Sequence, residues 1–264
     1  MADLHLASVS SSSVYGNAYI VWEDSSGPVL VDCGTPVKRL LRGLELLGFS
    51  PRDIRAVFIS HEHVDHVQSL CLKRPFPERF SIPVYASPLF WNWYFRCGYD
   101  LDRRLVRTIQ DGQRVREGGL TVSAFWKPHD STDPLSFVVE GKEGRAALLT
   151  DLGHVPSRII SLLRGAEYVV LESNHDVEME KSSGRPYPLI ARVLGDYGHL
   201  SNVQAGAALA RIVTKNTRKV VLAHLSVDCN TPEKAFRSSS EALFGTEFSG
   251  ELRVAPCKEL AVYC

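Results

Sequence analysis

The apolar stretch Ile54-Arg55-Ala56-Val57-Phe58-Ile59 runs directly into the polar stretch Ser60-His61-Glu62-His63-Val64-Asp65-His66. The apolar stretch is short and rich in β-branched and aromatic residues, which predicts a buried strand that stops where the polar residues start. The polar stretch is therefore expected on a loop at the end of that strand, entering a helix that begins near Val67.

The polar stretch places three imidazoles and one carboxylate within six positions, in the pattern H-x-H-x-D-H. Neutral imidazole and carboxylate are ordinary ligands of zinc and its neighbours, so a divalent metal site is the favoured interpretation. The alternative is a polar loop that carries histidines without binding anything. The dense spacing argues against that alternative.

The chain has 264 residues, which suits one large α/β domain or two small ones. Its 30 basic and 30 acidic residues balance, whereas proteins that hold nucleic acid through a broad basic face have an excess of cations. A phosphate-bearing substrate must therefore be held by metals and by a local patch. The sequence has no apolar run that could span a membrane and no signal peptide, so we expect a cytoplasmic protein with reduced cysteines.

The residues before the polar stretch alternate between strand and helix patterns. Asp32 closes the last of the early strands. Thr35 is expected to cap a helix that has Pro36 in its first position and ends at Gly48. Such alternation predicts an α/β fold. The early strands expected are Leu4–Val9, Tyr19–Trp22 and Val29–Val31, with a serine-rich turn at Ser10–Ser13.

Residues 71–107 interrupt this alternation with four prolines and one short expected strand, Val84–Ala86. Aromatic rings in this segment could stack on nucleic-acid bases. We favour packing of the rings against the body of the protein, because aromatic side chains are usually buried. The segment is expected to form a lid or an aromatic insertion within the same domain. The rings are Phe90, Trp91, Trp93, Tyr94, Phe95 and Tyr99.

Ligand-type residues recur where later strands stop. The strands expected are Thr121–Trp126, Ser136–Glu140, Ala146–Leu149, Tyr168–Leu171, Val220–Ala223 and a tail strand, Leu252–Tyr263. In α/β folds functional residues gather on loops at one edge of the sheet, so these residues are expected to converge. They are Asp32, His61 to His66, His129, Asp151, Glu172 and His224.

The stretch Gly198-His199-Leu200-Ser201-Asn202 is expected to enter a helix, because Ser201 and Gln204 form a capping box. A helix start offers free backbone N–H groups that favour a phosphate, and His199 stands just before it. The preceding residues, up to Pro188, form a polar stretch rich in serine, glycine and proline.

Taken together, these motifs resemble the metallo-β-lactamase-fold hydrolases over nearly the whole chain. The stretches Thr150–Gly153, Glu172–Asp176, Gly198–Asn202 and His224–Ser226 resemble the YycJ/WalJ-like branch, which is related to the RNase Z group and associated with exonuclease action on DNA. The resemblance implies a four-layer αββα sandwich formed by a single domain over residues 1–264, with metals at one edge. The serine-rich loop before Gly16-Asn17 departs from the branch's tighter glycine-serine turn.

The resemblance also implies roles for individual residues. Asp32 would orient the metal loop, His199 would help the leaving group depart, and Glu172 would orient His199. Asp65 would hold or deprotonate the attacking water. Ser201 and Asn202 are expected to contact substrate. Asn174 and His175 could contact it too, or could only brace their loop. The implied ligands are His61, His63 and His129 for one metal, Asp65, His66 and His224 for a second, and Asp151 for both.

The function expected on these grounds is a phosphodiesterase with two divalent metal ions, zinc or manganese. Two such cations lower the pKa of a water and stabilise the attacking and departing oxygens. DNA ends are favoured as substrate on the resemblance alone. The alternatives are a hydrolase of small phosphodiesters, lactones or thioesters, which zero net charge favours, and a non-catalytic metal-binding member of the fold.

Overall fold

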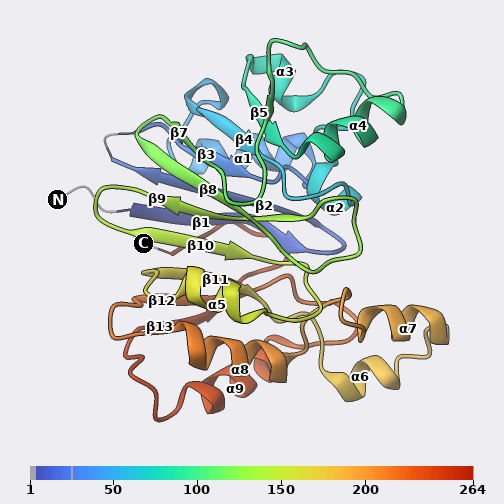
Figure 1. Ribbon diagram of the computed structural model, residues 1–264, viewed down its shortest axis with the longest axis vertical. Coiled ribbons are helices and arrows are strands. Elements are labelled where there is room, and N and C mark those ends of the chain that lie inside the picture. Colours follow the sequence, from blue (N-terminus) through green and yellow to red (C-terminus); the bar gives the residue numbers. More distant parts are fainter. Residues whose placement is uncertain (1–3, 25, 264) are drawn as a thin grey trace.

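The computed structural model describes residues 4–24 and 26–263. Within these residues the strands form two seven-stranded sheets that lie face to face, with helices over both outer faces (Figure 1). This is the αββα arrangement expected from the sequence. Over the same residues, no helix has the length and apolar character needed to cross a membrane.

The first sheet has the order β14-β1-β2-β3-β4-β5-β6 and the second has the order β13-β12-β11-β10-β9-β8-β7. The strands of the first are β1 (Leu4–Ser12), β2 (Gly16–Glu23), β3 (Val29–Val31), β4 (Ala56–Phe58), β5 (Val84–Ala86), β6 (Val106–Thr108) and β14 (Ala261–Val262). Those of the second are β7 (Arg114–Glu117), β8 (Leu120–Trp126), β9 (Leu135–Glu140), β10 (Arg145–Leu149), β11 (Tyr168–Glu172), β12 (Lys219–Ala223) and β13 (Glu251–Val254).

Helices cover the outer faces of both sheets, and two further helices project beyond the second sheet (Figure 1). Beside the first sheet lie α1 (Val37–Leu46), the 3₁₀ turn η1 (Pro51–Asp53), α2 (Val64–Val67), α3 (Phe76–Phe80) and α4 (Pro88–Arg96). The second sheet is covered by α5 (Ser157–Leu163), α8 (Asn202–Ile212) and α9 (Pro232–Leu243). The projecting helices are α6 (Val177–Lys181) and α7 (Tyr187–Val193).

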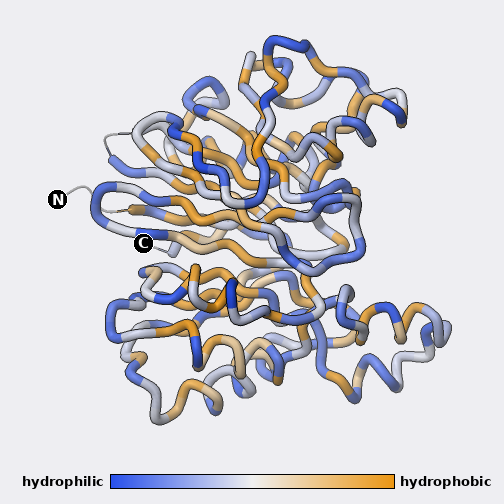
Figure 2. The backbone as a smooth tube through the Cα atoms, in the orientation of Figure 1, coloured by the Kyte–Doolittle hydropathy of each residue, from blue (hydrophilic) through white to orange (hydrophobic). Residues whose placement is uncertain are grey.

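Alternation of side chains along each strand produces a core between the sheets and one core under each helical layer. In β4, Ala56 and Phe58 face the opposite sheet, whereas Val57 faces the helices. The Phe58 ring stacks on Tyr85 with 4.9 Å between ring centroids and meets Phe137 of the second sheet edge-on at 5.7 Å. Hydrophobic residues accordingly follow the strands in Figure 2.

The strand directions bring the predicted polar residues to one edge. Strands β3 to β6 are parallel, as are β10 to β13. Strand β8 also runs parallel to β10, because each is antiparallel to β9. Their carboxyl ends therefore lead into the loops that carry the site residues, as the sequence predicts.

The structure corrects the expected turn at Ser10–Ser13. Strand β1 continues through Ser12, and its serine side chains are buried. Their hydroxyl groups have partners there: Ser10 Oγ donates to the Cys257 carbonyl at 2.7 Å, and Ser11 Oγ lies 2.7 Å from the Tyr19 hydroxyl. These long-range bonds make a buried serine run compatible with a strand.

Two expected helix starts are also wrong. Helix α2 begins at Val64, three residues before the expected Val67, so Asp65 and His66 lie on the helix. Thr35 does not cap α1; its hydroxyl accepts a hydrogen bond from Arg39 at 3.0 Å instead. The end of α1 is confirmed, since Gly48 follows it with a φ of +80°.

The polar stretch before Pro188 contains helix α6, and α7 starts at Tyr187. Asp176 caps α6 by accepting from the Met179 amide at 3.0 Å. The expected tail strand is two strands in different sheets, β13 and β14. Short edge strands carry little hydrophobic periodicity, which explains the expectation of a single tail strand.

Residues 71–107 are built into the first sheet through β5 and β6. Three of the six rings are buried as expected, namely Phe90, Trp91 and Tyr94. Trp93 and Phe95 are half-buried, and Tyr99 is exposed. The three buried rings belong to the same core as Val67 of α2.

The ring of Phe58 is fully buried between the sheets, so Phe58→Ala should lower the free energy of unfolding by about 3–5 kcal/mol. Urea denaturation of the purified protein measures this. The matched control is Phe244→Ala, because the Phe244 side chain is 92% exposed and its loss should change stability by less than about 0.5 kcal/mol. Equal effects of the two substitutions would contradict the described core.

Candidate metal centre

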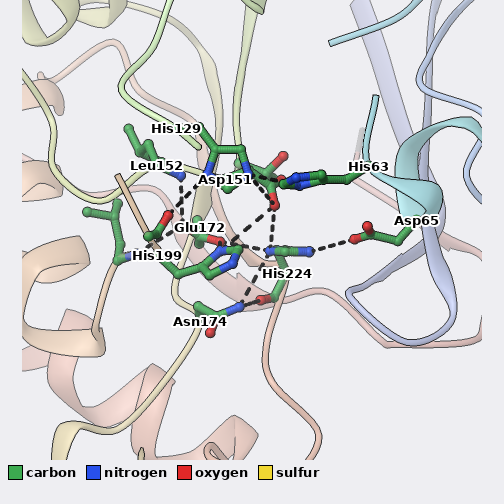
Figure 3. A network of polar contacts seen from close by, with 12 residues as sticks. His63, Asp65, His129, Asp151, Leu152, Glu172, Asn174, His199 and His224 are labelled. Carbon is green, nitrogen blue, oxygen red and sulfur yellow. Dashed lines mark hydrogen bonds and ion pairs between the residues drawn. The ribbon is translucent and has the colours of Figure 1, made fainter. Parts of the chain in front are cut away.

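The seven residues that the sequence singles out as ligands lie close together in the structure. Five of them, His63, Asp65, His129, Asp151 and His224, are labelled in Figure 3. One group is His61, His63 and His129, and the ligand-type atoms of its members lie within 4.8 Å of one another. A second group, by the same measure, is Asp65, His66, Asp151 and His224. A third, overlapping group joins Glu172 and His199 to Asp151 and His224.

Hydrogen bonds determine which ring nitrogen of His129 is free to bind a metal. Its Nδ1 lies 3.2 Å from the backbone carbonyls of both Tyr197 and Gly198. Carbonyls only accept, so Nδ1 carries the proton. Burial lowers the pKa of His129 to about 3, and the neutral ring then presents the lone pair of Nε2, which lies 3.2 Å from Nδ1 of His63.

The fully buried His61 offers a test of whether a cation fits here. Its Nδ1 lies 2.9 Å from the Ser60 hydroxyl, which itself donates to Asp32 at 2.9 Å and so accepts from His61. Within the described residues, His61 Nε2 is buried with no hydrogen-bond partner. A buried ring nitrogen without a partner is costly, and a divalent metal would satisfy it.

The buried Asp32 carboxylate is hydrogen-bonded to the segment that carries His61 and His66. Its Oδ1 accepts from the Ser60 amide at 2.8 Å. Its Oδ2 accepts from the Ser60 hydroxyl and from His66 Nδ1, the latter at 2.7 Å. Asp32 is therefore hydrogen-bonded to His66 directly and linked to His61 through Ser60, and these contacts restrain both rings.

Glu172 lies between His199 and His224 (Figure 3). Its Oε1 accepts from Nδ1 of His199 at 2.8 Å and from Nδ1 of His224 at 2.7 Å. Its Oε2 accepts from the amides of Leu152 and Leu200. The expectation from sequence concerned His199 alone. The structure adds that the same carboxylate also orients His224.

The two groups differ in electrostatics. Burial lowers the pKa of His61, His63 and His129, so these rings are neutral. Burial also opposes protonation of His224, but Asp151, Asp65 and Glu172 outweigh it and raise its pKa to about 10. Burial also lowers the pKa of His66, but the nearby carboxylates, chiefly Asp151 and Asp32, outweigh it and raise this pKa.

Three site residues have a left-handed backbone that is uncommon outside glycine. The φ angles are 58° at Asp32, 59° at Asp151 and 54° at His224. Such conformations cost about 1–3 kcal/mol each and persist where surrounding contacts enforce them. At His224 one such contact is visible: its amide donates to Ser11 Oγ at 2.8 Å. The turns begin just after β3, β10 and β12 and bring these side chains into the site.

Sequence reasoning did not single out Asn17 or Lys127. The Asn17 side-chain amide lies 3.2 Å from Asp65 Oδ2 and 3.1 Å from His66 Nε2. Lys127 is fully buried and donates to the Thr150 carbonyl at 2.6 Å. The sequence position of Lys127 could have indicated that it lies near the site. It follows the expected strand Thr121–Trp126 directly and stands two residues before His129.

The residues expected to contact substrate are all buried. Asn174 donates to the His224 carbonyl at 2.9 Å, Ser201 caps α8 as its capping box predicts, and Asn202 bonds to Ser173 and Asn230. The His175 ring is different: within the described residues neither of its nitrogens has a hydrogen-bond partner.

Residues 28–225 match a family described as the beta-lactamase superfamily domain. The chain is 31% identical to exodeoxyribonuclease YycJ of Bacillus anthracis, over 91% of this chain and 89% of that protein. It is 29% identical to exodeoxyribonuclease WalJ of Streptococcus pneumoniae, over 86% of this chain and 84% of that protein.

Among solved structures, Zn²⁺-bound PqqB from Methylobacterium extorquens has the same fold, with a TM-score of 0.72 over 98% of this chain and 99% of that chain at 16% identity. The family match, the two relatives and the clustered histidines and aspartates agree with one another. The chain belongs to the metallo-β-lactamase-fold hydrolases, in the branch of the YycJ and WalJ exodeoxyribonucleases, and is a metal-dependent hydrolase.

Proposed function

We propose that this hydrolase cleaves phosphodiester bonds at DNA ends with two divalent cations. The observation that carries the proposal is the pair of ligand groups beside the His199–Glu172 pair, since an exonuclease needs both metals and a group that protonates a departing oxygen. Both relatives named above are exodeoxyribonucleases, which supports DNA over RNA and over small esters.

The donor types suit this assignment. His61, His63 and His129 would hold one cation through imidazole nitrogens. Asp65, His66 and His224 would hold the other, and Asp151 would contribute to both. The mixed nitrogen and oxygen donors fit zinc or manganese.

Bound in this way, two divalent cations would lower the pKa of a water and would stabilise the attacking and departing oxygens of an in-line displacement. His199 supplies a proton. Because its Nδ1 is engaged by Glu172, Nε2 is the nitrogen left to donate to the departing oxygen. Asp65, whose carboxylate is held by Asn17, holds or deprotonates the attacking water. Asn174 stabilises the loop of His224 through a hydrogen bond to its carbonyl. His175, Ser201 and Asn202 form the part of the site that would contact the substrate.

The zero net charge favours a small phosphodiester, lactone or thioester as the alternative substrate. The protein should therefore be stripped with chelator, reloaded with Zn²⁺ or Mn²⁺, and tested on end-labelled duplex DNA, RNA and bis-p-nitrophenyl phosphate. The proposal expects release of nucleotides from DNA ends. Turnover of small esters without any DNA hydrolysis would contradict it, and two bound metals without any turnover would favour a non-catalytic member.

Removal of a ligand should abolish hydrolysis and metal content together. We expect His63→Ala and Asp151→Ala to lose at least about 100-fold in turnover of DNA, because each removes a donor from a metal that the reaction requires. His5→Gln is the control, because His5 lies on β1 and pairs with Asp24. Metal analysis and turnover of the same samples test this. A folded His63→Ala protein with full activity would refute the ligand assignment.

The role of His199 depends on the leaving group. His199→Ala should lower turnover of DNA by about 10²–10⁴-fold, because the departing alkoxide needs a proton. Turnover of bis-p-nitrophenyl phosphate should fall by less than about tenfold, since p-nitrophenolate departs without one. His154→Ala, at an exposed histidine that bonds to the Asp196 carbonyl, is the control. Equal losses on both substrates would show that His199 does not act on the leaving group.

Metal uptake should depend on pH differently at the two groups. His66 and His224 hold protons below their raised pKa values, so a cation must expel them, whereas His61, His63 and His129 are already neutral. We expect the affinity of the metal beside His66 and His224 to rise with pH between 6 and 9, by up to about 100-fold per pH unit. The affinity of the metal beside His61, His63 and His129 should stay nearly constant.

Calorimetric titration in buffers of different ionisation enthalpy counts the protons released. The variant Glu172→Gln removes a carboxylate that raises the pKa of His224, so its pH dependence should move to lower pH. Two metals that bind with the same pH dependence would contradict the charge states described for the two groups.

A further inference from the structure

The charge of this neutral chain is unevenly distributed. Residues 71–107 contain seven basic side chains against three acidic ones, Glu78, Asp100 and Asp102. All seven basic residues are exposed. We call this segment with its cations the basic cap. The cations are Lys73, Arg74, Arg79, Arg96, Arg103, Arg104 and Arg107.

Most of this charge is not neutralised within the protein. Among the described residues, Arg104 is the one member of the seven that forms an ion pair, with Asp102 at 2.6 Å. Arg103 lies over the Phe95 ring, 3.5 Å from its centroid. By contrast, the arginines of the projecting α6–α7 region are paired: Arg185 contacts Glu180 and Asp228, and Arg192 contacts Asp130.

The basic cap is fixed to the helix that carries two of the site residues. The Tyr94 hydroxyl donates to the Leu70 carbonyl at 3.0 Å, and the Phe76 amide donates to the Ser69 carbonyl at 2.8 Å. Ser69 and Leu70 lie two and three residues after the last residue of α2, on which Asp65 and His66 lie. In Figure 1, α4 and α2 lie on the same side of the molecule.

Unpaired exposed cations on a rigid support match the phosphates of a nucleic-acid backbone, which bind by charge without reading sequence. The rings of Phe90, Trp91 and Tyr94 are buried and cannot stack on bases, whereas Tyr99 is exposed. We propose that the basic cap binds the DNA backbone that leads to the scissile phosphate. This inference rests on the proposed function and names the surface that holds its substrate.

The test compares two triple variants. Lys73→Gln/Arg74→Gln/Arg96→Gln removes three cap cations whose side chains have no hydrogen-bond or ion-pair partner within the described residues. The control Arg52→Gln/Lys142→Gln/Lys215→Gln removes three exposed cations that precede β4, β10 and β12, at the edge opposite the site. Binding to a duplex with phosphorothioate-protected ends is measured by fluorescence anisotropy between 50 and 200 mM salt.

The cap variant should bind at least about tenfold more weakly at the lowest salt, and its slope of log K against log salt should be less steep by about two to three. The control variant should stay within about twofold of the unaltered protein. Both variants should hydrolyse bis-p-nitrophenyl phosphate normally. If the cap variant loses that turnover, the three single variants are measured instead, each expected to reduce the slope by about one.

Unchanged DNA affinity and slope in the cap variant, or an equal loss in the control, would overturn the inference. Loss of RNA binding with full retention of DNA binding would also overturn it. An unaltered protein that binds DNA through the cap without ever hydrolysing it would contradict the proposed function while supporting the cap as a binding surface.

Discussion

Two buried carboxylates determine how the site is arranged. Asp32 and Glu172 each accept hydrogen bonds from Nδ1 of histidines, and this leaves the Nε2 atoms of those rings directed toward the shared centre. Each carboxylate also accepts from backbone amides of the loops it joins. A buried carboxylate is stable only when its lone pairs are satisfied, so the loops and the rings hold one another in place.

The sheets supply these loops. Parallel strands end at one edge, and left-handed turns at Asp32, Asp151 and His224 bring the side chains into the centre as soon as the strands stop. The centre brings negative carboxylates and protonated imidazoles close together, with the buried Lys127 beside them. Divalent cations in place of those protons would also oppose the carboxylate charge and would satisfy the lone pairs that face inward.

Much of the fold and of the site could be predicted from the sequence. The H-x-H-x-D-H loop, the ligand-type residues at strand ends and the Ser201 capping box are local patterns, and each has the expected position. Local patterns could not reveal that Ser10–Ser12 form a strand, because Cys257, the partner of the Ser10 hydroxyl, lies far along the chain. Asn17 could not be recognised for the same reason, because its side chain contacts Asp65, which lies 48 residues further along the chain. The even charge balance hid the basic cap, because a sum over the chain does not record where the charges lie.

The central claim is that residues from both sheets form one cage for two cations. Crystals grown with Mn²⁺ and measured at a wavelength where manganese scatters anomalously test it most directly. The account predicts two anomalous peaks about 3.5–4 Å apart, one beside His61, His63 and His129, the other beside Asp65, His66 and His224, with Asp151 between them. A single peak, or peaks away from these side chains in a protein saturated with metal, would contradict it.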